Sequence, residues 1–260
     1  MKKYLTIFTT TIKEYFAYRL NFVLWRLRMF ISLIVIFFFW LAVMQNNANF
    51  AGYSQTMLLT YILYSSLIAD FVLGTRTSDV AGEINNGNII NNLLKPVSFF
   101  RLYLIKDFAD KSINVIFSLI EVLLVILLAK TYLIIPQNIL LFSIFFINGI
   151  FISFYINLLL SFIGFWTTES WAPRFVFLTV VYFLSGSYFP LDMLPKTIYQ
   201  LILLTPIPYL FFLPTKVIIG RVDSFVIYEL IGSLFWVLAC RFFAHYIWNK
   251  GNKSFSFWGR

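Results

Sequence analysis

Six apolar segments dominate the sequence, and their lengths decide what the chain can fold into. An α-helix rises about 1.5 Å per residue, so about 20 apolar residues cross the hydrocarbon core of a bilayer. Hydrophobic residues make up 60% of the chain and charged residues only 12%, whereas about 25% charged residues is typical of a soluble domain. We therefore predict an all-α integral membrane protein, with one transmembrane domain over residues 1–260 and spans at 24–44, 56–74, 98–130, 139–166, 174–185 and 225–248.

The segment that precedes the first span has the pattern of a surface helix. Within residues 4–20, the apolar side chains of Leu5, Phe8, Ile12 and Leu20 recur at multiples of three to four residues. This spacing places them on one face of an amphipathic helix, which is typical of a helix lying in the membrane interface. We expect residues 4–20 to form an elbow before the first span.

The longest polar stretch between apolar segments is residues 75–111, which carries five basic and four acidic side chains. Ser78 or Asp79 can begin a first short helix that Gly87 ends in a left-handed conformation. A second short helix is expected over 89–94, because a proline at position 96 cannot continue it.

The four apolar side chains of the second short helix need a cover. Two covers remain open at this point: the membrane bundle itself, or a soluble protein that docks from the cytosol. The side chains concerned are Ile89, Ile90, Leu93 and Leu94. The helix that follows can run unbroken from Ser98 to Lys130, about 48 Å, so its first turns should project from the bilayer.

The basic residues predict which side of the membrane each loop occupies. With six spans, 16 of the 20 Lys and Arg residues lie on the side of the two termini. Cytoplasmic loops carry the excess of Lys and Arg, so we expect both termini and the 75–111 stretch to be cytoplasmic. Segment 186–220 would then be external, as re-entrant or surface helices. Asp70 and Glu229, near the ends of their spans, are expected close to water.

The sequence lacks the motifs of an enzyme. It has no phosphate-binding glycine loop, no nucleophile elbow and no paired histidines. A single cysteine, Cys240, and a single histidine, His245, leave no cluster for a structural metal. We expect no bound cofactor, no nucleic-acid partner and no catalytic residue, so any ATP-driven step requires a separate ATPase.

Glu121 is the ionisable residue expected nearest the middle of the membrane. Lys111, Asn114, Ser118 and Glu121 follow one another at spacings of three and four, on one helix face. An ionisable group at this depth is costly and usually faces the bundle interior or a cavity. Glu121 could serve the transport pathway, as the ion site of a proton-coupled transporter or channel. We favour a neutral, hydrogen-bonded acid that holds helices together.

A second polar pattern occupies the fourth span. Gly149, Ser153, Asn157 and Ser161 repeat every four residues, forming one stripe of small and polar side chains. Such stripes allow close approach of helices in membranes. We favour a packing face, within one chain or across a dimer, over a face that lines a substrate path.

Two motifs resemble those of ABC-2 type transporter permeases, in particular the six-span bacterial branch. One is GEINNGNIINNLLKPVS after the second span, and the other is SGSYFPLDMLPKTIYQLILLTPIPYLFFLP after the fifth. The second motif carries the more telling spacing, through Gly186, Pro190, Pro195, Pro206 and Pro208.

The resemblance implies an amphipathic elbow, a cytoplasmic coupling helix at about residues 79–95 and short external helices at 190–218. It also implies a homodimer or heterodimer of permeases in the bacterial cell membrane, working mainly in export. Two separate ATPase subunits would carry ATP and Mg. At the coupling helix, we expect Asp79, Glu83 and Lys95 to orient the ATPase and the apolar side chains to bind it. The substrate is not implied.

Overall fold

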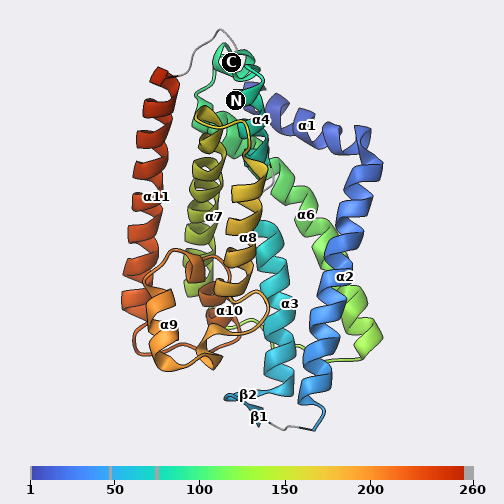
Figure 1. Ribbon diagram of the computed structural model, residues 1–260. Helices are drawn as coiled ribbons and strands as arrows, with labels where there is room; N and C mark the ends of the chain where they lie inside the picture. The colour runs from blue at the N-terminus through green and yellow to red at the C-terminus, as the bar shows by residue number, and fades with distance from the viewer. Residues whose placement is uncertain (1, 47–48, 74–75, 255–260) are drawn as a thin grey trace.

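The molecule is a bundle of long helices, as Figure 1 shows. The computed structural model describes residues 2–46, 49–73 and 76–254, so the predicted limits at Gly74 and Thr75 lie outside the described residues. Five helical segments are long and apolar enough to cross a membrane, which confirms the all-α membrane fold. They contain α2 (Arg19–Met44), α3 (Gln55–Val72), α6 (Phe99–Ala129), α7 (Ile139–Ser161) with its 3-10 extension η2 (Phe162–Phe165), and α11 (Val226–Ser254).

The fifth predicted span forms a shorter helix than the other five. It is α8 (Trp171–Leu184), 14 residues long, or about 21 Å at the usual rise. The hydrocarbon core is about 30 Å thick, so α8 alone does not cross it. The helix stops before Gly186, whose φ of 79° no helical residue adopts.

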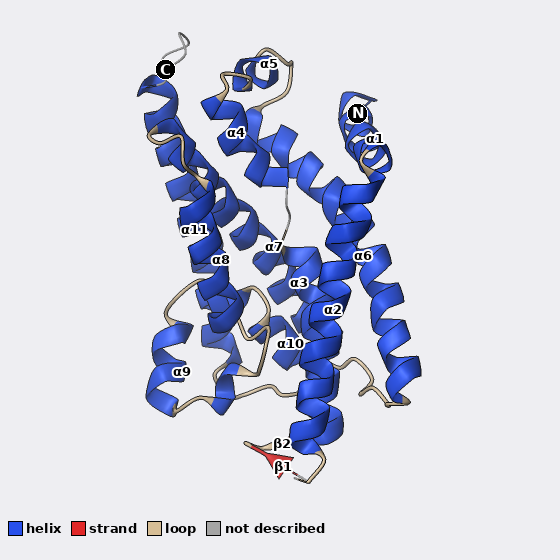
Figure 2. Cartoon of the chain, turned by 45° about the vertical axis from the view of Figure 1, so that its right-hand side comes forward, coloured by secondary structure: helices blue, strands red, loops and turns tan. Residues whose placement is uncertain are grey.

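The two ends of the bundle carry different elements (Figures 1 and 2). The short helices α4 (Asp79–Asn85) and α5 (Ile89–Leu93) lie at the same end as α1 (Lys2–Ala17) and the last turns of α11. The hairpin of β1 (Asn49–Phe50) and β2 (Tyr53–Ser54) lies at the opposite end with α9 (Lys196–Leu203). This arrangement agrees with the predicted grouping of termini and polar stretch on one side.

The elbow region is helical and breaks near its predicted end. Tyr18 separates α1 from α2, and α1 packs against α6. Thr11 of α1 is buried, whereas Leu5 and Phe16 are 66% and 73% exposed. Leu5 and Phe16 therefore remain available to lipid.

The proline-rich segment folds into four short helices, and prolines precede the first three. Pro190, Pro195 and Pro206 directly precede η3 (Leu191–Met193), α9 and η4 (Ile207–Tyr209). Proline suits these positions because its missing N–H has no helical partner at a helix start. The fourth helix, α10 (Phe212–Ile218), is buried and packs against α7 and α3. The segment thus inserts one helix into the bundle and leaves α9 at its surface.

The uncharged loop between α2 and α3 closes this end of the bundle. Ala51 and Gly52 both have positive φ, of 49° and 81°, which is the backbone of a tight hairpin turn. The hydroxyl of Tyr53 donates to Asp192 at 2.8 Å, and Arg221 donates to the Gly52 carbonyl at 3.1 Å. The hairpin is therefore fixed to the proline-rich segment.

Candidate functional site

The polar stretch forms two short helices that are mounted firmly on the bundle. Gly87, with a φ of 73°, separates α4 from α5 as predicted. The helix α4 packs on η2, where a side chain on Gly164 would come within 3.0 Å of the Ala81 carbonyl. Ser78, which was expected to begin this helix, makes no side-chain cap. The backbone contact with η2, rather than capping, holds α4 in place.

The bundle covers part of the apolar surface of α5 and leaves part of it free. Ile89 is 1% exposed and belongs to a core cluster with Phe99 and Trp248, while Leu93 is partly buried against the same cluster. Ile90 is also partly buried. Leu94, by contrast, is 79% exposed. The sequence left two possible covers for these side chains, the bundle or a docking protein. The bundle covers Ile89, whereas Leu94 stays exposed.

Polar contacts join α5 to α4 and to the start of α6. Asn92 donates to Glu83 at 2.6 Å, and Lys95 donates to the Asn92 side-chain oxygen at 2.6 Å. Glu83 also accepts from Tyr103 and lies 3.7 Å from Lys106. Glu83 and Lys95, expected to orient a partner, are thus engaged within the chain.

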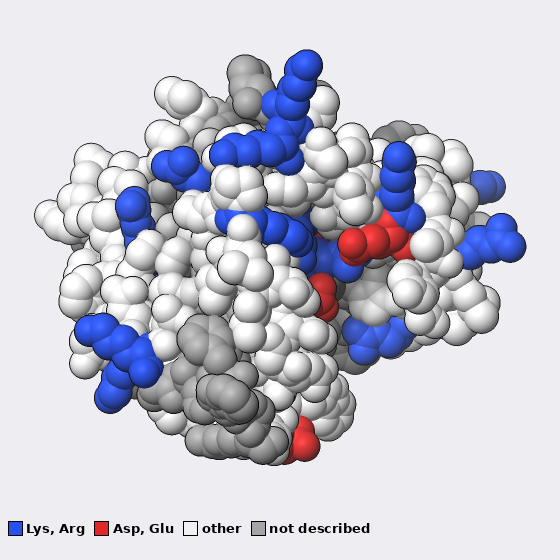
Figure 3. All heavy atoms as spheres, turned by 90° about the horizontal axis from the view of Figure 1, so that it is seen from above, with Lys and Arg blue, Asp and Glu red and all other residues white. Residues whose placement is uncertain are grey.

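Asp79 remains the more accessible acid of this region. It is exposed, and its carboxylate lies 3.7 Å from Arg76. Figure 3, which looks onto this end, shows Lys and Arg side chains spread over the surface and few acids. This end therefore presents a mainly basic surface.

Glu121 does not stand alone in the bundle. Arg26 of α2 donates to Glu121 at 2.9 Å and lies 3.1 Å from Asp70 of α3. Ser118 accepts from Arg26 at 3.1 Å and itself donates to Asp70. The Arg26 side chain is 5% exposed, against 13% for Asp70 and 12% for Glu121. This polar cluster joins α2, α3 and α6 through one guanidinium.

Asp70 is 13% exposed and paired with Arg26, and Glu121 shares this cationic partner, which the sequence did not reveal. Arg26 had been counted only among the basic residues that set the topology. One signal was present: Arg26 begins one span and Asp70 ends the next, so antiparallel packing places them at the same depth. Glu121 therefore joins α6 to α2 through its hydrogen bond with Arg26, and the neutral state expected for it stays a prediction.

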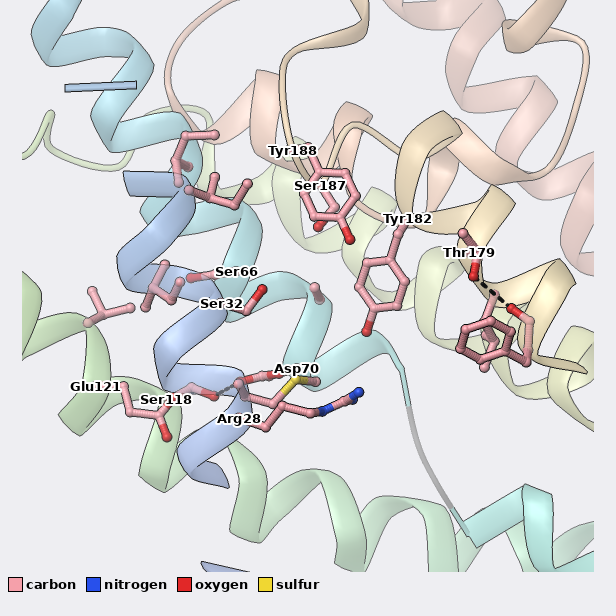
Figure 4. Close-up of a pocket in the computed structure, with 18 residues that line it drawn as sticks. Arg28, Ser32, Ser66, Asp70, Ser118, Glu121, Thr179, Tyr182, Ser187 and Tyr188 are labelled. Atoms are coloured by element: carbon pink, nitrogen blue, oxygen red, sulfur yellow. Dashed lines mark hydrogen bonds between the residues drawn. The ribbon is translucent and has the colours of Figure 1, made fainter. Parts of the chain in front are cut away.

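A cavity of about 360 Å³ borders this polar cluster. Figure 4 shows its walls, with Arg28 and Ser32 on α2 facing Thr179 and Tyr182 on α8. Asp70, Ser118 and Glu121 line it on the inner side. Arg28, Ser32 and Thr179 are exposed, so the cavity reaches the molecular surface between α2 and α8.

The stripe on α7 is buried along its whole length. A side chain on Gly149 would come within 2.9 Å of the Tyr209 carbonyl, at the junction with η4. Ser161 donates to the Thr77 carbonyl at 2.6 Å, and Ser153 is 1% exposed. The cavity described above is lined by other residues. This geometry is that of a packing face within one chain.

The stripe also anchors α8, through a residue that the sequence did not single out. Arg174 donates to the Asn157 side chain at 2.8 Å and to the Ser161 hydroxyl at 3.1 Å. Moving a charged guanidinium out of water is unfavourable unless it is hydrogen-bonded. The two polar residues of α7 therefore serve as its acceptors and fix the start of α8.

Gly186 of the proline-rich motif makes a close contact with α3. A side chain on Gly186 would come within 2.6 Å of the Tyr61 hydroxyl, which donates to the Gly186 carbonyl at 2.6 Å. Pro208 is buried in η4. Nearby, Lys216 contacts Asp223 and lies 3.6 Å from Glu229. Glu229 is 10% exposed, so its expected position close to water is wrong.

The described residues, 2–46, 49–73 and 76–254, offer no group of three or more His, Cys, Asp or Glu side chains that could hold a metal ion.

A family model described as "ABC-2 family transporter protein" matches residues 30–259. The chain belongs to this family. It is thus a multi-pass membrane component of a transporter. A search of curated proteins found no match. The ABC-2 assignment accounts for the long helices and does not favour the proton-coupled alternative based on Glu121.

Proposed function

We propose that this ABC-2 protein is the permease subunit of an exporter driven by a separate cytosolic ATPase, which would carry ATP and Mg. The observation that carries the proposal is the exposure of Leu94, at 79%, directly after the short helix α5, which is tied to the bundle.

The connection from α5 to the membrane supports a mechanical role. The helix α6 begins five residues after Leu94 and continues without a break for 31 residues, about 46 Å. Phe99 at its start stacks on Trp248 of α11 with ring centroids 3.8 Å apart. Ile89 of α5 lies in the same core cluster, so a push on α5 would reach both α6 and α11 through packed side chains.

The orientation proposed is that α4, α5 and both termini face the cytoplasm and the proline-rich segment faces outward, in the plasma membrane of a bacterium. The basic surface at the α4–α5 end supports this orientation. Two copies of the chain, or this chain with a related permease, would pair with two ATPase subunits.

The docking assignment is tested by replacing the exposed leucine. Burial of one leucine in an ATPase groove contributes about 1.5–3 kcal/mol, so Leu94→Asp should weaken co-purification of the ATPase by about 10-fold or more. Changing Leu93 as well would disturb the core cluster it packs against, so the single variant is the cleaner test. Leu204→Asp is the matched control, because Leu204 is 72% exposed at the opposite end. Equal recovery of ATPase by the two variants would reject the assignment.

A further inference from the structure

The cavity between α2 and α8 contains an unmatched charge. Arg28 lines it and is exposed, and no ion pair joins Arg28 to any acid among the described ranges. The nearby carboxylates of Asp70 and Glu121 are already held by Arg26. Arg28 therefore offers its guanidinium to an anion that comes from outside the chain.

The rest of the cavity wall divides into a polar part and an apolar part. Hydroxyl groups project into it from three elements, and Figure 4 shows those of Ser32, Tyr182 and Ser187 around the open space. The apolar part is made by the side chains of α2, α3, α6 and α8, namely Met29, Leu33, Ile36, Ile62, Val122 and Leu178. The volume of about 360 Å³ falls in the range of about 300–1,000 Å³ found for small-molecule sites.

We propose that this cavity binds an anionic amphiphile, whose charged headgroup lies at Arg28 and whose apolar chain lies against the α2, α3 and α8 side chains. The opening between α2 and α8 lets such a molecule enter from the side of the bundle. As a statement about the transported substrate, the proposal rests on the permease function above; as a statement about binding, it requires no ATPase.

The charge balance explains why the ligand should be anionic. Arg26 serves two carboxylates, so a cationic ligand could be drawn to the excess negative charge of that cluster. Those carboxylates are 12–13% exposed, however, and are hydrogen-bonded to Arg26 and Ser118. Arg28 is the charged group that extends from the wall without a partner, and it therefore determines the sign of the headgroup.

The test compares two probes that differ in headgroup charge and share one chain. Purified protein in a neutral detergent is titrated with dodecyl phosphate and with dodecylphosphocholine. We expect dodecyl phosphate to bind at least ~10-fold more tightly, because a hydrogen bond to a charged group is worth about that factor. Arg28→Ala should remove the preference, and Arg28→Lys should retain part of it. Arg19→Ala, which removes a charge from the exposed start of the same helix, should leave it intact.

A second variant tests the cavity without touching the charge. Ser32→Trp should fill the opening and weaken both probes alike, while size-exclusion chromatography confirms the fold. In nanodiscs, retention of phosphatidylglycerol over phosphatidylcholine would assign the same site to a bilayer lipid. Equal binding of the two probes, or an unchanged preference in Arg28→Ala, would overturn the binding proposal. Binding with no effect on hydrolysis, in a complex whose ATPase still co-purifies, would overturn the substrate assignment alone.

Discussion

Removal of the Arg26 side chain should destabilise the folded protein substantially. In Arg26→Leu, Asp70 and Glu121 lose the guanidinium that lies 3.1 and 2.6 Å from them. Removing one partner of a buried ion pair costs about 3–5 kcal/mol, because the other charge stays buried without compensation. We expect the lower end, about 3 kcal/mol, since both carboxylates border a cavity that water can enter.

This loss corresponds to a measurable fall in melting temperature. For a chain of 260 residues, 1 kcal/mol corresponds to about 2–4 °C, so Arg26→Leu should melt about 6–12 °C lower in detergent. Thermal unfolding followed by fluorescence-detected size exclusion measures the shift. Arg28→Leu, two residues along the same helix and exposed, is the control and should change the melting temperature little.

A compensating variant separates unpaired charge from lost packing. Arg26→Leu combined with Asp70→Asn and Glu121→Gln has no buried charge in the cluster, and such replacements are often neutral or stabilising. The triple variant should recover most of the melting temperature. If Arg26→Leu melts like the unchanged protein, or if the triple variant is no more stable than the single one, the polar cluster does not hold the helices as described.

Three further changes test other parts of the structure. Gly149→Leu should sharply reduce the yield of folded protein on size exclusion, because even a Cβ there comes within 2.9 Å of a backbone carbonyl; normal yield with lost transport would make the stripe a substrate path. Glu121→Gln should keep transport in vesicles, since the amide oxygen still accepts from Arg26, and loss of proton-driven transport would instead revive the ion-coupled alternative. Cysteines at Thr197 and Asn252, both exposed, should react with an impermeant thiol reagent from opposite sides of the membrane; labelling from one side would reject the topology.

Features that depend on local sequence could be predicted before the structure was known. The long helices follow from apolar length, and the division of α4 from α5 follows from Gly87, since glycine adopts positive φ without strain. The start of α9 after Pro195 has the same local origin. These features require only neighbouring residues, so the sequence carries them directly.

Contacts between distant residues could not be predicted in the same way. Arg26 and Glu121 are 95 positions apart in the sequence, and their pairing depends on how α2 and α6 pack. The burial of Glu229 depends on α10 entering the bundle and placing Lys216 beside it. The cavity at Arg28 arises from the position of α8, which hydropathy does not specify. Such tertiary arrangements decide which polar residues are paired and which remain free.

Site-specific crosslinking from α5 tests most directly whether this end of the molecule receives the ATPase. The native Cys240 is 5% exposed, so Leu94→Cys supplies an accessible thiol for a short photoreactive reagent, and Leu204→Cys supplies its match at the opposite end. In membranes that contain both subunits, we expect an ATPase adduct from position 94 and none from position 204. An adduct from position 204, or none from position 94 in a complex that hydrolyses ATP, would contradict the proposed coupling through α5.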